Sequence, residues 1–223
     1  MSKAIYLSPS MQENNVGAGS YGTEEKRMNQ VADVVERVLI DHGVKVYRNK
    51  PDWTLQQAVK DSNSKKPDLH YAIHSNAGGG RGGEVFAYAP SGEGEKAARA
   101  IYFELEPITP TSDRGVKFNP KLYELNSTNA PAALVEIAFH DNADDAKWII
   151  DNIEGIGIAL AKGVLKYFGI AYKEPSKPEV QPSDDQKLYR VMAGSYSIRE
   201  NAEKQVRKLK AAGFDAVIMI FNK

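Results

Sequence analysis

Residues 68–86, "DLHYAIHSNAGGGRGGEVF", decide how this chain is expected to fold. The apolar run 69–74 carries aromatic and β-branched residues and stops at a glycine-rich loop, which predicts a buried strand and not a helix. The run 84–88, directly after the glycines, predicts a second strand.

His70 and His74 stand four residues apart in the first of these runs. On a helix this spacing would place both rings on one face for a shared zinc ion. On a strand the two residues share a face but lie about 13 Å apart, at ~3.3 Å per residue. Because Zn–N bonds are about 2 Å long, one metal cannot bind both rings. His74 lies at the carboxyl end of its strand, where ligands gather in open α/β sheets, so it is either a ligand or a cap of the strand.

Apolar runs and helix-period segments alternate along the rest of the first three quarters of the chain. This alternation predicts an α/β fold with a mostly parallel central sheet flanked by helices. The region 106–131, with four prolines, is expected to be irregular, and 141–168 to be helical with interruptions at Gly155 and Gly157. The other expected strands are 4–8, 44–48 and 132–139, and the other expected helices are 24–42, 53–63 and 93–105.

The composition excludes several classes of function. Lysine plus arginine and aspartate plus glutamate both number 29, so neither nucleic acid nor a membrane surface is an expected partner. The 223 residues include no cysteine, which removes disulfides, thiolate chemistry and cysteine-bound metal. The first residues contain no apolar run long enough for a signal peptide, so we expect synthesis in the cytoplasm without one.

Two glutamates are candidates for chemistry alongside His74. Glu136 interrupts the apolar strand "ALVEIAF", where an ionised carboxylate is costly unless it is paired, with Arg114 a candidate partner, or faces a metal. Glu25 lies in the first turn of a helix, where an acid commonly serves only the helix dipole. If His74, Glu25 and Glu136 meet at the sheet edge, their mixed nitrogen and oxygen ligands suit a catalytic zinc.

Five motifs occur in order along residues 3–170: "EKRMN" (25–29), "AIHSNAGGG" (72–80), "GGEVF" (82–86), "DRGVK" (113–117) and "LYELNSTNAPAALVEIAFHDN" (122–142). Together they resemble the zinc-dependent N-acetylmuramoyl-L-alanine amidases of the Amidase_3 family, found in bacterial autolysins and phage endolysins. The resemblance implies hydrolysis of the amide between N-acetylmuramic acid and L-alanine in bacterial peptidoglycan. It also implies Zn²⁺ as cofactor, Glu25 and His74 as zinc ligands, and Glu136 as the catalytic carboxylate.

One departure from the family concerns its first zinc ligand, a histidine in D-P-G-H-G-G. Here the stretch is "LSPSMQENN" (7–15), which resembles a clostridial-type subgroup, and Met11 stands at the histidine position. A thioether is a poor zinc ligand. We expect the neighbouring Gln12 to supply an amide oxygen, with Asn14, Asn15, Glu13 or water as alternatives.

The resemblance also predicts substrate-binding residues. Asn76, Arg114 and the loop "GGGRGG" (78–83) are expected to position substrate, with Arg81 or Arg114 binding a stem-peptide carboxylate. Zinc-bound water would be the nucleophile, and Glu136 would take its proton. The alternative function is a catalytically inactive peptidoglycan-binding protein that keeps the amidase fold.

The final segment is expected to form a separate unit. We expect a catalytic domain over 1–171, a proline-rich and charged linker over 172–186, and a small strand–helix–strand unit over 187–223. This last unit resembles half of a SPOR domain, a peptidoglycan-binding module, so a homodimer in which two halves share one sheet is a hypothesis. Action on the cell wall would follow release, in phage lysis or mother-cell lysis.

Overall fold

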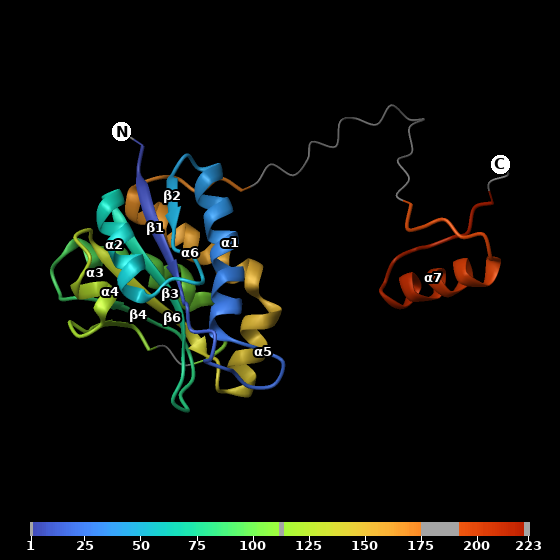
Figure 1. Cartoon of the computed structure of the whole chain (residues 1–223), viewed down its shortest axis with the longest axis horizontal. Helices are drawn as coiled ribbons and strands as arrows, with labels where there is room; N and C mark the ends of the chain where they lie inside the picture. The colour runs from blue at the N-terminus through green and yellow to red at the C-terminus, as the bar shows by residue number, and fades with distance from the viewer. Residues whose placement is uncertain (1, 112–113, 175–191, 221–223) are drawn as a thin grey trace. The chain divides into compact units, whose positions relative to one another are not determined.

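The computed structural model describes residues 2–111, 114–174 and 192–220 (Figure 1). The chain forms two compact units, Met1–Glu174 and Pro175–Lys223.

The first unit is built on a six-stranded sheet in the order β2-β1-β3-β6-β4-β5. Strands β2, β1, β3 and β6 run parallel, and β4 lies antiparallel to β6 and parallel to β5. The mostly parallel sheet predicted from the sequence is therefore confirmed. The strands are β1 (Ala4–Pro9), β2 (Lys45–Arg48), β3 (Leu69–Asn76), β4 (Glu84–Ala87), β5 (Val116–Phe118) and β6 (Ala132–Phe139).

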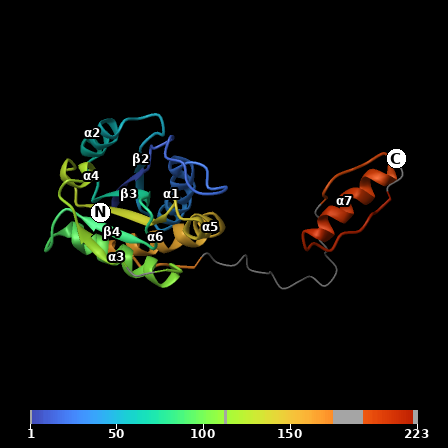
Figure 2. The same cartoon turned by 90° about the horizontal axis from the view of Figure 1, so that it is seen from below.

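The two faces of the sheet are covered unequally. Helices α1 (Glu24–Asp41), α3 (Glu93–Leu105) and α6 (Ile153–Phe168) pack together and bury the larger apolar cluster on one face. Among the described residues, the helices on the opposite face are α2 (Leu55–Lys65) and the single turn α4 (Tyr123–Asn126), with a small cluster around Ala72 and Leu134. Figure 2 shows α2 and α4 on one side of the sheet and α3 and α6 on the other. The thinly covered face leaves room for a site.

Helix α1 begins as the sequence predicts, because the hydroxyl of Thr23 accepts a hydrogen bond from the backbone N–H of Lys26. The helical segment after β6 breaks elsewhere than expected. It divides into α5 (Ala143–Asp151) and α6 at Asn152, and Gly155 and Gly157 both lie within α6. Gly157 serves close packing, since a Cβ there would lie 2.5 Å from Cβ of Val34 in α1.

The region 106–131 is more ordered than expected. It contains the 3₁₀ turn η1 (Glu106–Ile108), the edge strand β5 and helix α4. The prolines of this region led to the expectation of irregular structure, but Pro107 lies within η1 and the other three lie outside β5 and α4. Helix α4 matters most, since it brings a buried carboxylate to the open face of the sheet.

In the second unit, the described residues form one helix, α7 (Arg199–Ala211), which has no buried residue. The expected flanking strands are absent from 192–198 and 212–220, and the parts of those predictions at 188–191 and 221 lie outside the described residues. A strand needs a partner to satisfy its backbone, and the described residues of this unit supply none. Across the described chain, no helix is long and apolar enough to cross a membrane.

Candidate active site

Three neighbouring strands place a row of polar side chains on the thinly covered face. His74 on β3 is in register with Glu136 on β6, and Glu136 is in register with Glu84 on β4. Paired residues on adjacent strands point to the same face, so one histidine and two glutamates lie side by side.

His74 lies between two carboxylates. Its Nδ1 donates to Oε1 of Glu24 at 2.9 Å, and its Nε2 lies 3.3 Å from Oε2 of Glu124. Burial alone would lower the pKa of His74, but the hydrogen bonds to Glu124 and Glu24 outweigh burial and hold that pKa well above its usual value. When the ring is protonated, both of its nitrogens can donate to these carboxylates.

Glu124 joins His74 to the second histidine of the opening motif. Its Oε1 accepts from Nε2 of His70 at 3.1 Å, and Nδ1 of His70 is 2.9 Å from Oγ of Ser62. Burial would raise the pKa of Glu124, yet the hydrogen bonds from His70 and His74 bring it far below the usual range. We call this arrangement the carboxylate bridge. Two rings that no single metal can reach thus share one glutamate.

Glu136 has no such partner. Its Oε2 is buried and has no hydrogen bond among the described residues. Burial raises the pKa of Glu136 to about 7; the charge of His74 opposes this shift, and the charges of Glu24 and Glu84 add to it. Arg114, the partner considered from the sequence, instead donates from Nε to Glu84 at 3.0 Å.

Glu84 organises the cationic side of the site. Besides Arg114, it accepts from Nδ2 of Asn76 at 2.7 Å and pairs with the ammonium of Lys117. Asn76 and Arg114, both predicted to bind substrate, therefore meet next to Glu136. Lys117 was not predicted, although it lies in the "DRGVK" motif.

Arg81 is placed differently from the other predicted substrate residues. Its guanidinium pairs with Asp144 at 3.2 Å and with the buried Asp145 at 3.3 Å. Asp141 accepts from the backbone N–H groups of Gly78 and Gly79. The glycine-rich loop is thus bound to the start of α5, and a substrate role for Arg81 stays a prediction.

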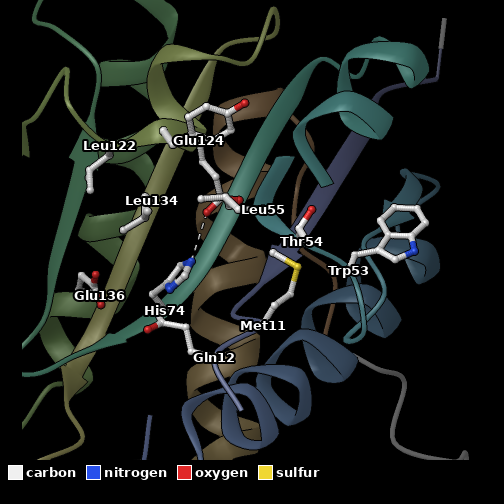
Figure 3. Close-up of a pocket in the computed structure, with 11 residues that line it drawn as sticks. Met11, Gln12, Trp53, Thr54, Leu55, His74, Leu122, Glu124, Leu134 and Glu136 are labelled. Atoms are coloured by element: carbon white, nitrogen blue, oxygen red, sulfur yellow. Dashed lines mark hydrogen bonds and ion pairs between the residues drawn. The ribbon is translucent and has the colours of Figure 1, made fainter. Parts of the chain in front are cut away.

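A cavity of about 400 Å³ opens over His74 and Glu136 (Figure 3). Gln12 and Met11 reach it from the loop after β1, and Oε1 of Gln12 accepts from Nδ2 of Asn15 at 3.4 Å. The other lining residues are Trp53, Thr54, Leu55, Leu122, Tyr123, Glu124 and Leu134.

The structure brings Glu24, and not the neighbouring Glu25, to His74. Glu24 is buried, and its carboxylate also accepts from Nδ2 of Asn15 at 2.7 Å and from the backbone N–H of Ser75 at 3.3 Å. Glu25 is half-buried beside it. Its predicted role as a ligand is not supported by proximity and stays a prediction.

The donors around the cavity are of kinds that zinc accepts, namely imidazole, carboxylate and amide. However, both ring nitrogens of His74 already contact carboxylates. Within the described residues, no three histidine, aspartate or glutamate side chains form a group that could hold a metal ion. The arrangement as it stands does not fit a zinc ion.

Comparison with known proteins identifies relatives over nearly the whole chain. The family model Amidase_3, described as N-acetylmuramoyl-L-alanine amidase, matches residues 5–166, and the SPOR domain model matches residues 134–220. The N-acetylmuramoyl-L-alanine amidase CwlM of Bacillus licheniformis is 28% identical over 96% of this chain and 84% of its own length. The sporulation-specific N-acetylmuramoyl-L-alanine amidase of Bacillus subtilis is 24% identical over 97% of this chain and 84% of its own length.

Solved structures share the fold of the first unit. The catalytic domain of CwlV, an amidase from Bacillus (Paenibacillus) polymyxa, matches with a TM-score of 0.70 at 21% identity, over 76% of this chain and 99% of that one. The catalytic domain of the CD27L endolysin matches with a TM-score of 0.63 at 26% identity, over 74% of this chain and 98% of that one. The α/β fold predicted from the sequence is thus confirmed.

Proposed function

This chain belongs to the Amidase_3 family of N-acetylmuramoyl-L-alanine amidases, and from that membership we propose how its own residues act. The bond cleaved joins the lactyl group of N-acetylmuramic acid to L-alanine in peptidoglycan. The observation that carries the proposal is the carboxyl group of Glu136, which lines the cavity, has a buried Oε2 without a hydrogen bond among the described residues, and has a pKa raised to about 7.

Glu136 is the general base. A carboxylate with a pKa near 7 is ionised in part of the molecules at neutral pH and is a stronger base than an ordinary glutamate. Its carboxylate takes the proton of the attacking water and then passes it to the nitrogen of the leaving L-alanine. Overall, water adds across the C–N bond to give a carboxylic acid and an amine.

His74 supplies positive charge beside this base. Glu24 and Glu124 hold the ring in one orientation in the folded protein. The ring therefore does not have to reorient when the reaction occurs. Asn76 and Arg114, fixed by Glu84, position the substrate on the other side of Glu136.

Zinc dependence stays a prediction of the family resemblance, with Gln12, Glu25 and His74 as its ligands. Elemental analysis of the purified chain and lysis assays with and without a chelator test it. Bound zinc that is lost in Gln12→Ala, together with chelator-sensitive lysis, would support the prediction. If the purified chain contained no zinc and a chelator left its rate of lysis unchanged, the prediction would be refuted.

The C-terminal unit is proposed to bind peptidoglycan, because the SPOR domain model matches through residue 220. A homodimer through this unit stays a prediction, which sedimentation at high micromolar concentration would test. Release to the wall during phage or mother-cell lysis stays a prediction as well.

The decisive experiment compares wild type with Glu136→Gln on purified cell walls. Wild type should release new L-alanine amino termini, and the variant should release none while keeping its fold by circular dichroism. If the variant released amino termini at the wild-type rate, Glu136 would not be the base. If wild type bound walls without releasing any, the inactive binding protein would be the correct alternative.

A further inference from the structure

The surface around Glu136 has two chemically unlike ends. At one end, apolar and aromatic side chains form what we call the aromatic wall: Trp53 and Leu55 before and at the start of α2, and Leu122 and Tyr123 at the start of α4. On the other side of Glu136, beyond the residues that line the cavity, Arg114 and Lys117 pair with Glu84 and form what we call the cationic end.

Glu136 lies between these two ends. In Figure 3, Trp53 and Glu136 lie on opposite sides of His74. Glu84 is on β4, the strand on the far side of β6 from β3, and Lys117 is on β5, one strand further. Because adjacent strands are about 4.8 Å apart, the cationic end lies within roughly 10 Å of the proposed base.

The groups at each end remain accessible. Tyr123 is 39% exposed, and Trp53 is half-buried with the ammonium of Lys50 5.5 Å from its ring centroid. The side chains of Arg114 and Lys117 are 30% and 41% exposed although each pairs with Glu84. One glutamate beneath two cations leaves a net positive charge for an anion.

We propose that this asymmetry sets the direction in which the substrate lies: the muramoyl sugar packs on the aromatic wall, and a stem-peptide carboxylate binds at the cationic end. The inference rests on the proposed amidase function. The apolar C–H face of a pyranose ring suits an aromatic surface, and a carboxylate suits a guanidinium and an ammonium. The scissile amide joins these two parts of the substrate, so it falls between the two ends, over Glu136.

The test measures binding to the full chain carrying Glu136→Gln, which prevents turnover. The probes are N-acetylmuramoyl-L-alanyl-D-glutamate, the sugar-free N-lactoyl-L-alanyl-D-glutamate, and the muramoyl dipeptide with both carboxylates amidated. Calorimetry gives Kd for each probe in the parent and with Trp53→Ala or Lys117→Met added. Tyr88→Ala, at a 50% exposed tyrosine that does not line the cavity, is the matched control.

Trp53→Ala should raise the Kd of the muramoyl dipeptide about tenfold and leave the Kd of the sugar-free probe unchanged. Lys117→Met should raise the Kd of both probes with free carboxylates about tenfold and leave the Kd of the amidated probe unchanged. Tyr88→Ala should bind like the parent. The inference would be overturned if Trp53→Ala weakened binding of the carboxylate probes irrespective of the sugar and Lys117→Met weakened binding only of the probes with a sugar. It would also be overturned if both substitutions weakened binding of every probe equally. Cleavage of walls by the otherwise wild-type chain is measured in parallel, and its absence would instead refute the proposed function.

Discussion

The carboxylate bridge makes a quantitative prediction for Glu124→Ala. The substitution removes the one group that contacts both His70 and His74, and it leaves Nε2 of each ring without that partner. A buried polar group left unpaired costs about 1–3 kcal/mol, so two such groups cost about 2–6 kcal/mol. The wild-type protein also pays a desolvation cost for burying the Glu124 carboxylate, and losing that cost in the variant offsets part of the destabilisation. Removing one partner of a buried pair typically costs about 3–5 kcal/mol. We expect a loss of about 3–4 kcal/mol.

Glu124→Gln removes the charge of this side chain and nearly keeps its shape, so it isolates the contribution of the charge to the free energy of unfolding. The amide oxygen can still accept from His70, and the amide N–H can donate to a neutral His74. Only the charge-assisted part is lost, because hydrogen bonds to charged groups contribute about 1.5–3 kcal/mol and neutral ones about 0.5–1.5. We expect a loss of about 1–2 kcal/mol.

The assay is urea unfolding at pH 6, followed by tryptophan fluorescence, since both tryptophans, Trp53 and Trp148, lie in the first unit. The lowered pKa of Glu124 adds stability above its unfolded value near 4.5, and this stability is lost as pH falls towards the folded pKa. The raised pKa of His74 adds stability below its unfolded value near 6.5, and this stability is lost as pH rises through the folded pKa. Both contributions are therefore present at pH 6.

With a urea slope of about 2 kcal/mol per molar, Glu124→Ala should lower the midpoint by about 1.5–2 M. Glu106→Ala, at an exposed acid of the 3₁₀ turn, is the control and should change stability by less than about 0.5 kcal/mol. If Glu124→Ala unfolded at the same urea concentration as Glu106→Ala, the carboxylate bridge would contribute nothing to stability and the reasoning would be wrong.

The remaining predictions concern packing, proton transfer and the first helix. Gly163→Ala should destabilise the first unit by about 1–3 kcal/mol, since its Cβ would lie 2.4 Å from Cα of Ile101. Gly155→Ala in the same helix, where nothing lies within 4 Å, should stabilise it by about 0.5–1 kcal/mol in the same urea titration. Lysis should rise with pH through about 7 as Glu136 loses its proton, and a rate already at its plateau at pH 5 would contradict this. The raised pKa means that stability contributed by Glu136 falls from about pH 4.5 to about 7, so Glu136→Gln should gain stability relative to wild type over that range. Glu24→Gln should reduce lysis at least tenfold, whereas Glu25→Gln should reduce it less than twofold, and the reverse order would favour the sequence motif over the structure.

The long elements could be predicted because their patterns are local. The helix 93–105 and the strand 132–139 have the predicted bounds, since continuous periodicity and flanking turn residues define both ends. Helix α4 could not be found this way. It is four residues long, and its place depends on Leu125 packing against Leu134 and Ala72, which are distant in the sequence.

The candidate site was predictable only in part for a similar reason. His74 and Glu136 stand out locally, one at a strand end and one inside an apolar strand. Glu124 has no comparable local signal, because its partners His70 and His74 are 54 and 50 residues away in the sequence. The spacing of His70 and His74 on a strand argues against a shared metal, but it does not reveal that a carboxylate with two oxygens can contact both.

The choice between Glu24 and Glu25 was available in the sequence. Successive residues on a helix point about 100° apart, so only one of the two can share the buried stripe. Glu24 is four residues before Met28 and seven before Val31, both fully buried, and it therefore belongs to that stripe. Glu25 is four before Asn29 and lies at the edge of the stripe. The motif spacing selected the acid that matches the family pattern, whereas the phase of the apolar stripe selects the acid that faces the sheet. Where the two criteria disagree, the phase should decide which side chain reaches His74, because burial of Met28 and Val31 fixes the rotation of the whole helix.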